Sequence, residues 1–397
     1  SHPASRLTPT TRRDTTRTAM TTNPPTPVSS LFTPLQIGPV TLPNRIMVSP
    51  MCQYCAVDGQ PVPWHTAHLG SLAMSGAGLL CVEATGVNPE GRITPGCLGL
   101  YSDETQAALQ RVVQAVRSIS RIPLALQLSH AGRKASSRTP WEGGSLIAPA
   151  DGGWVPQGPS AIAQKPDEPP PHAMTEADIR HVIESFRQAT VRARALGFDV
   201  IELHMAHGYL VHQFLSPLAN TRTDRYGGSL ENRMRLALEV FEAVRDAAGP
   251  GLPVGVRLSA TDWAEGGWDI ASTVELSRRL EAAGCHFLDI SSGGLSYQQK
   301  IPVGPGYQVH LAAEVKAAVG IPVVTVGLIT EPAHAEQIVR DGQADVVALA
   351  RGFLHDPRWP WRAAAQLGGT LVPPRQLLRC LPHGHAPIFG DVRIGQR

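Results

Sequence analysis

The sequence predicts an α/β protein that folds as a single (β/α)8 barrel, the TIM barrel. Three observations carry the prediction: eight short, β-branched apolar runs recur along the chain, amphipathic helical patterns separate most of them, and no linker divides the chain beyond residue 30. A doubly wound open sheet is the alternative fold. The first run, however, is not followed by the G-x-G-x-x-G pattern that is typical of such sheets.

The eight apolar runs are the predicted strands. Each run is continuous and of strand length, as expected for parallel strands that are covered on both faces. The runs comprise residues 45–50, 78–85, 123–130, 198–204, 254–259, 286–293, 322–327 and 345–352.

Helices are predicted between these strands. Apolar residues recur at helical spacing after Thr175, which is suited to cap the helix, and Asp178 stands three residues further on. Another helix is predicted over residues 229–249, with Ser229 as its cap and Gly249 just past its end. Further helical patterns cover residues 103–119, 271–283, 309–319 and 332–341.

Three segments stand apart from this alternation. Residues 1–30 are rich in Thr, Pro, Ser and Arg without periodicity, and we expect a disordered extension whose first two residues resemble a tag-cleavage scar. The barrel then spans residues 31–397, including a C-terminal segment over 370–397. Residues 131–173 are Gly/Pro-rich and follow the third strand, so we expect an irregular lid insertion over the barrel mouth.

Charge and composition exclude several classes of partner. The formal net charge is +2, and residues 1–30 hold four arginines against one aspartate, so the remainder is close to neutral and offers no case for nucleic acid or a membrane surface. No apolar run is long enough to span a bilayer, and because residues 1–30 lack an apolar stretch we expect no secretory signal in them. The six cysteines do not suggest a disulfide framework, and we expect a cytoplasmic protein.

The chemistry of a barrel lies at the carboxyl ends of its strands. In this sequence those ends are unusually polar, and their convergence on one mouth predicts an active site. They comprise residues 51–54, 83–85, 127–130, 204–209, Arg257, 291–294, Gly327 and 350–352.

Two of these ends suggest particular ligands. Gly327 and Arg351 follow the seventh and eighth strands, the usual phosphate site of a barrel. His204 and His207 follow the fourth strand, and neutral imidazoles there could donate hydrogen bonds to an oxygen that gains negative charge.

Two other functions stay open on the residues alone. Cys52 and Cys55 form a C-x-x-C pair at the same mouth, which would allow a zinc-dependent hydrolase using His204 and His207. A binding scaffold is the other possibility, although a scaffold does not need a polar mouth. Barrels that depend on a metal commonly carry H-x-H on the first strand and Asp on the last, and neither is found here, so we expect no metal.

Several blocks resemble the Old Yellow Enzymes, which are flavin-dependent ene-reductases. The resemblance runs from about Leu31 to the C-terminus, and "SPMCQY" is similar to the thermophilic-like subclass. The blocks are "SPMCQY" (49–54), "WHTAHLGSLAMSGAGLLCVEATGVNPEGR" (64–92), "QLSHAGRK" (127–134), "GFDVIELHMAHGYLVHQFLSPLANTRTDRYGGSLENRMR" (197–235), "VRLSATDW" (256–263), "DISSGG" (289–294) and "ALARGFLHDPRWPW" (348–361).

This resemblance implies FMN at the mouth, with NADPH or NADH as the reductant. It implies that Gln127 reads the pyrimidine edge of the flavin and that Arg257 stabilises charge at its N1/O2 side. The residues implied in cofactor binding are Pro50, Met51, Cys52, Ala84, Gln127, Arg257, Gly294, Gly327, Ala350 and Arg351.

The resemblance also implies a reaction with ping-pong kinetics. Reduced FMN passes a hydride from N5 to the β-carbon of an activated alkene, such as an enone, enal, maleimide or nitroalkene. His204 and His207 polarise the acceptor carbonyl, and Tyr209 supplies the proton. Cys52 tunes the flavin, and Tyr54 lines the substrate pocket.

Two features depart from the resemblance. Relatives often carry Q-Y-x-R near the C-terminus, which reaches into a neighbouring subunit, whereas this chain has Gln376-Leu377-Leu378-Arg379. We therefore expect a homodimer or homotetramer in which Arg379 contacts substrate in trans. Cys55 has no counterpart in the subclass, and we interpret it as incidental, with transient oxidation to a Cys52–Cys55 disulfide as an alternative hypothesis.

Overall fold

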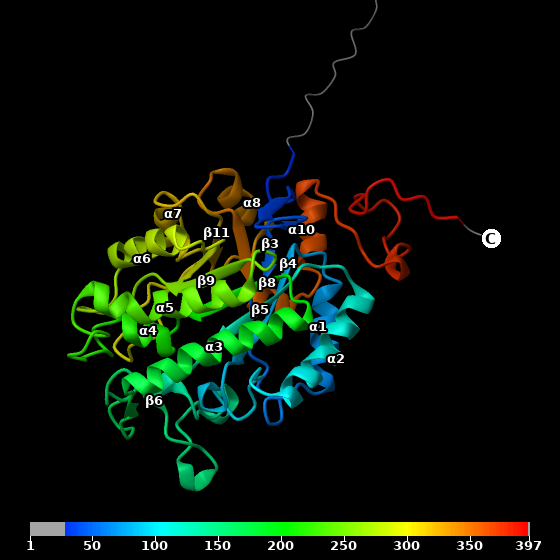
Figure 1. Ribbon diagram of the computed structural model, residues 1–397. Coiled ribbons are helices and arrows are strands. Elements are labelled where there is room, and N and C mark those ends of the chain that lie inside the picture. Colours follow the sequence, from blue (N-terminus) through cyan, green and yellow to red (C-terminus); the bar gives the residue numbers. More distant parts are fainter. Residues whose placement is uncertain (1–27, 396–397) are drawn as a thin grey trace, which may run out of the picture.

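The computed structural model describes residues 28–395 and contains a closed barrel of eight parallel strands surrounded by helices (Figure 1). The predicted (β/α)8 fold is confirmed. Each of the eight predicted runs corresponds to one barrel strand. The strands are β3 (Ile46–Val48), β4 (Leu79–Gly86), β5 (Leu124–Ser129), β8 (Val200–Met205), β9 (Val254–Ser259), β10 (Leu288–Ser291), β11 (Val323–Val326) and β12 (Val346–Leu349).

The predicted helices are also present, and the best-defined start is that of α3. The Thr175 hydroxyl accepts a hydrogen bond from the Asp178 N–H at 3.1 Å, and the Asp178 carboxylate accepts one from the Thr175 N–H at 2.9 Å, which is a capping box. The confirmed helices are α2 (Asp103–Ile119), α3 (Glu176–Leu196), α5 (Leu230–Ala248), α6 (Ile270–Ala282), α7 (Val309–Lys316) and α8 (Pro332–Arg340).

Four helices were not predicted. In α4 (Leu210–Leu215) every residue is buried, so its sequence has no polar face and no helical periodicity. The last predicted strand was too long, because β12 ends at Leu349 and α9 (Arg351–His355) follows at once. The other two are α1 (Pro63–Ala73) and α10 (Trp359–Leu367).

An apolar layer closes the amino end of the barrel. Alternate residues of each strand point inward, and the layer includes Met47, Val200 and Phe287. A Cβ at Gly255 would collide with the Phe287 ring, so glycine at that position makes room for the aromatic side chain. A hairpin that was not predicted, β1 (Leu35–Ile37) with β2 (Val40–Leu42), covers this layer from outside. The barrel therefore has one polar opening, at the carboxyl ends of its strands.

The chain segment just before this hairpin is ordered. Ser29 Oγ donates a 2.5 Å hydrogen bond to Glu336, and the backbone N–H groups of Ser30 and Leu31 donate to the same carboxylate. The fold thus begins earlier than the predicted boundary at residue 31. The predicted disorder of residues 1–27 lies outside the described residues.

The insertion after β5 has short elements of its own. It contains the 3-10 turns η2 (Gly132–Lys134), η3 (Pro140–Glu142) and η4 (Pro149–Asp151), and a parallel pair of strands, β6 (Gln157–Gly158) and β7 (His172–Ala173). Figure 1 shows it below the barrel, on the side of the carboxyl strand ends.

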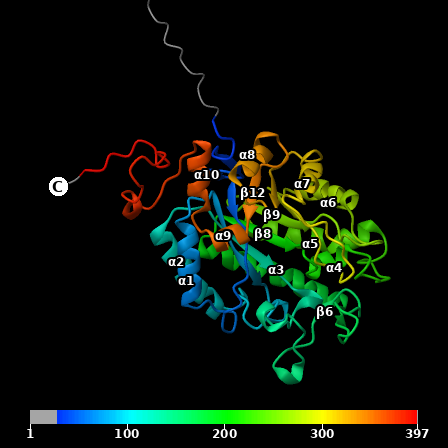
Figure 2. The same cartoon turned by 180° about the vertical axis from the view of Figure 1, so that it is seen from behind.

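The segment after α10 lies at the opposite end of the molecule, as both views show (Figures 1 and 2). It contains η5 (Arg375–Leu377), and Leu371 and Ile388 pack with Trp361 of α10.

Candidate active site

A buried polar layer lies above the apolar one. Neighbouring strands pair Gln127 with Glu202, and Arg257 with Asp289. The Arg257 guanidinium donates to Asp289 at 2.8 Å and lies 3.6 Å from Glu202, which accepts a 2.8 Å hydrogen bond from Gln127. Gln127 and Arg257, both predicted at the flavin, therefore share one hydrogen-bonded network.

This layer holds one cation and two carboxyl groups. Burial and the nearby Asp289 charge raise the pKa of Glu202 well above its ordinary value, and the Arg257 charge opposes the shift. Arg257 also forms an ion pair with Asp289 at 2.6 Å. Among the described residues, Glu202 Oε1 and Asp289 Oδ1 are buried without a hydrogen-bond partner. These two buried carboxyl oxygens of the layer are therefore available for further hydrogen bonds.

His204 points into the mouth from β8 as a neutral imidazole. Its Nδ1 accepts a hydrogen bond from the Ala206 N–H at 3.3 Å, so the ring proton resides on Nε2. Burial, together with His207 and Arg257, lowers the pKa of His204 well below 6.5. The neutral Nε2–H is thus free to donate to an acceptor oxygen.

His207 is held in an unusual backbone conformation. Its φ is 58°, its N–H donates to Ser259 Oγ at 2.9 Å, and its Nε2 lies 2.7 Å from Ser291 Oγ. The His204 and His207 rings are 5.2 Å apart and nearly perpendicular. Burial and the Arg257 charge lower the pKa of His207 as well. The two predicted histidines therefore meet as a pair of neutral imidazoles.

The turn after His207 depends on glycine. Gly208 has a φ of 74°, and a Cβ there would collide with the carbonyl oxygen of Gly294. A buried pair braces this turn from behind: His212 Nδ1 accepts from the Gly208 N–H at 2.8 Å, and His212 Nε2 donates to Asp262 at 2.7 Å. His212 and Asp262 were not assigned from the sequence.

Lys134 is a further residue that sequence reasoning missed. Its ammonium donates to the carbonyl oxygens of His207 at 2.7 Å and Gly294 at 2.9 Å, and it lies 4.9 Å from the centre of the Tyr209 ring. Burial, followed by the Arg133 charge, lowers the pKa of Lys134 to about 8. The available signal was its place in "QLSHAGRK", directly after a strand with a polar end.

Tyr209 packs with its ring edge-to-face on His204, at 4.8 Å between centres. Burial raises the pKa of its phenol well above 10, and Cys52 and Tyr54 add to the shift. The phenol is therefore protonated at any physiological pH, as a proton donor must be.

Cys52 and Cys55 face different neighbours. Cys52 and Tyr54 pack with Tyr209 against a small apolar cluster that includes Cys97. Cys55 Sγ instead lies 4.0 Å from His65 Nε2. All six cysteines are free thiols, and within residues 28–395 no three His, Cys, Asp or Glu side chains are grouped to hold a metal ion. The C-x-x-C pair does not converge with His204 and His207.

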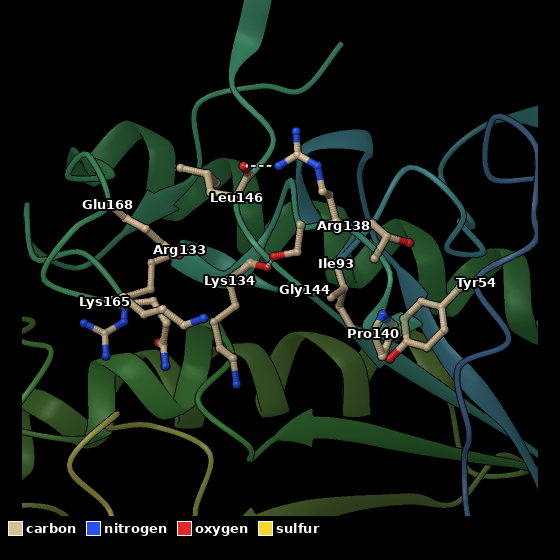
Figure 3. Close-up of a pocket in the computed structure, with 13 residues that line it drawn as sticks. Tyr54, Ile93, Arg133, Lys134, Arg138, Pro140, Gly144, Leu146, Lys165 and Glu168 are labelled. Carbon is tan, nitrogen blue, oxygen red and sulfur yellow. Dashed lines mark hydrogen bonds between the residues drawn. The ribbon is translucent and has the colours of Figure 1, made fainter. Parts of the chain in front are cut away.

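A cavity of about 220 Å³ lies beside these residues, between the mouth and the insertion (Figure 3). Tyr54 and Lys134 belong to its wall, and Arg138 and Lys165 come from the insertion. Arg138 donates to the Leu146 carbonyl at 2.8 Å. Within residues 28–395, neither Arg138 nor Lys165 has a carboxylate within ion-pair distance, so the cavity has an excess of positive charge.

The predicted FMN residues gather around the mouth. Cys52 and its two predecessors follow β3, Ala84 lies in β4, Gly294 follows β10, and Gly327 and Ala350 each follow the end of a strand. The backbone N–H groups of Gly327 and Arg351 make no hydrogen bond within the described part of the chain, and the Arg351 side chain is exposed. Unused N–H donors and a free guanidinium suit a phosphate, so these residues fit FMN.

Arg379 is the exception among the predicted site residues. It is exposed, and it follows η5 in the segment that packs on α10. A groove of about 850 Å³ separates part of that segment from residues that precede β3, β4 and β5, such as Asn44, Ala77 and Pro123. Arg379 therefore lies at the amino end of its own barrel, and it cannot reach its own mouth.

Comparisons with known proteins agree with this site. The family described as NADH:flavin oxidoreductase / NADH oxidase matches residues 30–369. A NADH:flavin oxidoreductase from Gibberella zeae is 43% identical over 86% of this chain and 86% of its own. An NADPH dehydrogenase from Bacillus subtilis is 40% identical over 88% of this chain and 98% of its own.

Solved structures point the same way. Morphinone reductase in complex with tetrahydroNAD is 30% identical, with a TM-score of 0.70 over 86% of this chain and 92% of its own. A 2-naphthoyl-CoA reductase is 26% identical with a TM-score of 0.76, and this chain spans 52% of its length. The chain belongs to the NADH:flavin oxidoreductase / NADH oxidase family, and it is an FMN-dependent oxidoreductase of the Old Yellow Enzyme type that takes electrons from NAD(P)H.

Proposed function

We propose that this enzyme reduces alkenes conjugated to a carbonyl or nitro group. The supporting observation is the pair of neutral imidazoles at the mouth, His204 and His207, with the protonated phenol of Tyr209 packed against the first. FMN, when bound, supplies the hydride.

The roles of the chain's own residues follow from their protonation. His204 Nε2–H, joined by His207, donates to the acceptor oxygen as negative charge moves onto it. Neutral imidazoles are suited to this, because their hydrogen bonds strengthen as the oxygen gains negative charge and no charged group has to be buried beside the neutral acceptor. Tyr209 gives its proton to the α-carbon. Tyr54 lines the substrate pocket, and Cys52 contacts the flavin edge.

We assign the cavity beneath the insertion to the reductant. The nicotinamide ring must reach the mouth, so the phosphates of NAD(P)H have to lie further out. Arg138 and Lys165 line that outer space, in which Glu168 is the one lining carboxylate, and they are suited to bind those phosphates. Because Tyr54 and Lys134 line the same cavity, reductant and acceptor compete for one space, which supports ping-pong kinetics.

A role for Arg379 requires a second subunit. Its position at the amino end of its own barrel supports the proposal that it acts in trans within a homodimer or homotetramer. None of the helices described between residues 28 and 395 is long and apolar enough to cross a lipid bilayer. The cytoplasmic location stays a prediction from the sequence.

The proposal is tested with the FMN-loaded enzyme under anaerobic conditions. The flavin absorbance is first bleached with NADPH or NADH, and acceptors are then added: 2-cyclohexenone, N-ethylmaleimide, a nitroalkene and, as a matched control, cyclohexanone. The flavin band should return with the three activated alkenes and not with the saturated ketone. Recovery with oxygen or quinones alone would contradict an ene-reductase.

A further inference from the structure

We propose that Tyr54 and Trp141 form a binding corner for an aromatic ring, and that the enzyme therefore favours activated alkenes that carry an aryl group. The inference rests on the proposed function and deepens it by naming a substrate class. It gives Trp141, a residue of the insertion, a role in specificity.

Trp141 is an exposed indole that touches the mouth. It lies in η3 and is 70% exposed, and its ring meets that of Tyr54 with the ring centres 5.7 Å apart. Single exposed apolar side chains are ordinary on protein surfaces. This one differs because its ring contacts a residue that lines the cavity beside the mouth. The exposed part of the indole is therefore free to pack against a ligand that extends out of the mouth.

The two rings form a corner because their planes are 81° apart, so that one ring presents its edge to the face of the other. Aromatic pairs favour an offset stack or an edge-to-face contact over a direct face-to-face arrangement. A third ring placed in a perpendicular corner can stack on one wall while it meets the other wall edge-on, and it then gains both favourable geometries. An aliphatic ring of similar size gains only the burial of its surface.

Both walls of the corner are held in place. Tyr54 has a φ of 56°, an uncommon backbone conformation for a residue with a side chain, and such conformations cluster at sites that contact ligands. In the insertion, Thr139 Oγ1 donates to the Glu142 carboxylate at 2.7 Å, and the Glu142 N–H donates to the Thr139 carbonyl at 3.0 Å. These two bonds close the turn that carries Trp141. The rings therefore need little reordering when a ligand binds, which lowers the entropic cost of binding.

The corner adjoins the apolar side of the cavity. Tyr54, Ile93 and Pro140 line that side, and Figure 3 shows them on one side of the view with Lys165 on the other. Pro140 directly precedes Trp141 in the chain, so the apolar wall continues from the cavity to the indole. An uncharged aryl group therefore finds apolar surface here, away from the lysine that we assign to the phosphates of the reductant.

An acceptor can reach this corner from the proposed hydrogen-bond donors. The Tyr209 ring packs on His204 with 4.8 Å between centres, and Tyr209 and Tyr54 pack against the same small apolar cluster. An acceptor whose oxygen lies at His204 and whose alkene extends past Tyr209 brings its far end to Tyr54. An aryl group on that end continues towards Trp141. The favoured acceptors are thus enones and nitroalkenes with an aromatic ring on the alkene.

The experiment compares two acceptors of similar size, benzylideneacetone and its cyclohexyl analogue, with the FMN-loaded enzyme. The ratio of their kcat/KM values is measured for the wild type and for Trp141→Ala, so that the difference in intrinsic reactivity between the two enones cancels. The ratio should fall by about threefold to tenfold in the variant, the value of one aromatic pair. Trp141→Phe should keep most of the preference, whereas Trp141→Leu, which is apolar but not aromatic, should lose it.

A second readout does not require turnover. Benzylacetone, the saturated product of benzylideneacetone, binds without reacting, and its Kd is measured from the change that it causes in the flavin absorbance. This Kd should rise by about the same factor in Trp141→Ala. The matched control is Trp64→Ala, which removes an indole of α1 that is 57% exposed and should leave both the ratio and the Kd unchanged.

An unchanged ratio together with an unchanged Kd in Trp141→Ala would overturn the proposal, as would an equal loss in Trp64→Ala. A higher Kd for NADPH with an unchanged acceptor ratio would also overturn it, because Trp141 would then serve the reductant. If neither enone reoxidises the flavin, the proposed function fails, and the Kd of benzylacetone still decides whether the corner binds an aryl group.

Discussion

Lys134 Nζ donates a 2.7 Å hydrogen bond to the backbone carbonyl of His207, and this bond ties the start of the insertion to the turn that carries this proposed substrate donor. The same ammonium also holds the Gly294 carbonyl, so a single cation sets the relative position of three loops. The order of the mouth therefore depends on a residue that does not itself donate to the substrate.

The first prediction concerns this cation. Lys134→Met keeps the length of the side chain but removes the bond to His207, and we expect kcat to fall by about tenfold to a hundredfold through misplacement of the imidazole. Stopped-flow rates of flavin reoxidation by an enone measure the effect. An unchanged rate would show that His207 holds its place without Lys134.

A pH dependence follows from the same residue. Burial lowers the pKa of Lys134 from 10.5 to about 8, so the folded protein releases this proton above about pH 8, while the unfolded chain keeps it until about 10.5. Across that window the contribution of Lys134 to stability improves as pH rises, because the unfolded state binds the extra proton. Activity should nevertheless decline above pH 8, and Lys134→Arg should move the decline to higher pH.

The next prediction concerns the neutral imidazoles. Replacing His204 by Ala should lower the rate of the acceptor half-reaction by about 10²–10³, while Asn, which keeps an N–H donor, should lose less. Because the pKa values of both histidines lie well below 6.5, the profile of kcat/KM for the enone should be flat between pH 6 and 7.5. An inflection near 6.5 that disappears in the His204 variants would contradict neutral donors.

Tyr209→Phe isolates the proton transfer. The variant keeps the edge-to-face contact with His204 but loses the hydroxyl, so reduction of the flavin by NADPH should be unchanged while enone turnover slows by about 10²–10⁴. A nitroalkene offers a useful comparison, since its nitronate product can leave the site before it is protonated. Equal slowing of both half-reactions would assign Tyr209 to packing rather than to proton donation.

Arg138→Gln and Lys165→Gln test the reductant site. Each should raise the Kd for NADPH by about tenfold, the value of one charge-assisted hydrogen bond, with the limiting rate of flavin reduction unchanged. A reductant without phosphates, 1-benzyl-1,4-dihydronicotinamide, should be unaffected, and a larger effect with NADPH than with NADH would place the 2′-phosphate in the cavity. Arg111→Gln, an exposed arginine on α2, serves as the control. An equal rise in Kd for NADPH, NADH and the reductant without phosphates would exclude Arg138 and Lys165 from phosphate binding.

Asp262 sets a limit on acid stability. Burial alone would raise its pKa, but hydrogen bonds from His212, Ser216 and the Trp268 N–H outweigh burial and lower it. A lowered carboxyl pKa stabilises the fold above the unfolded value of about 3.9, and this stability is lost as pH falls through the folded pKa. Asp262→Asn should cost about 1–3 kcal/mol at pH 7. In urea unfolding, the difference in unfolding free energy between Asp262→Asn and the wild type should narrow towards pH 3. A difference that stays constant with pH would show that the lowered pKa of Asp262 is not its cause.

Periodicity in the sequence was sufficient for the barrel, because buried parallel strands and amphipathic helices have distinct patterns. Periodicity failed to predict α4, because every residue of that helix is buried. It also failed for β1 and β2, because each has three residues, too few to show a period. His204, His207 and Tyr209 could be placed at the mouth because His204 lies at the carboxyl end of β8 and the other two lie in the turn that follows.

The remaining site residues depend on contacts that no local pattern encodes. Lys134 and Gly294 are 160 positions apart in sequence, and nothing local indicates that they touch. Similarly, the sequence places Cys52 beside Cys55, whereas the fold turns Cys55 towards His65 and packs Cys52 against the apolar cluster that includes Cys97. Spacing in the sequence identified the two thiols, but only the tertiary structure shows that their surroundings differ.

The bond from Ser29 to Glu336 spans 307 residues and has a consequence for biosynthesis. The hairpin of β1 and β2 is synthesised first, but the segment that leads into it is anchored only after α8 has been made. The apolar layer that the hairpin covers also includes Phe287, which directly precedes β10, and Val346 of β12. Folding of such a non-local closure is slow and leaves the hairpin exposed in the nascent chain. The hairpin that seals the finished barrel is therefore among the first elements synthesised and the last to gain all of its contacts.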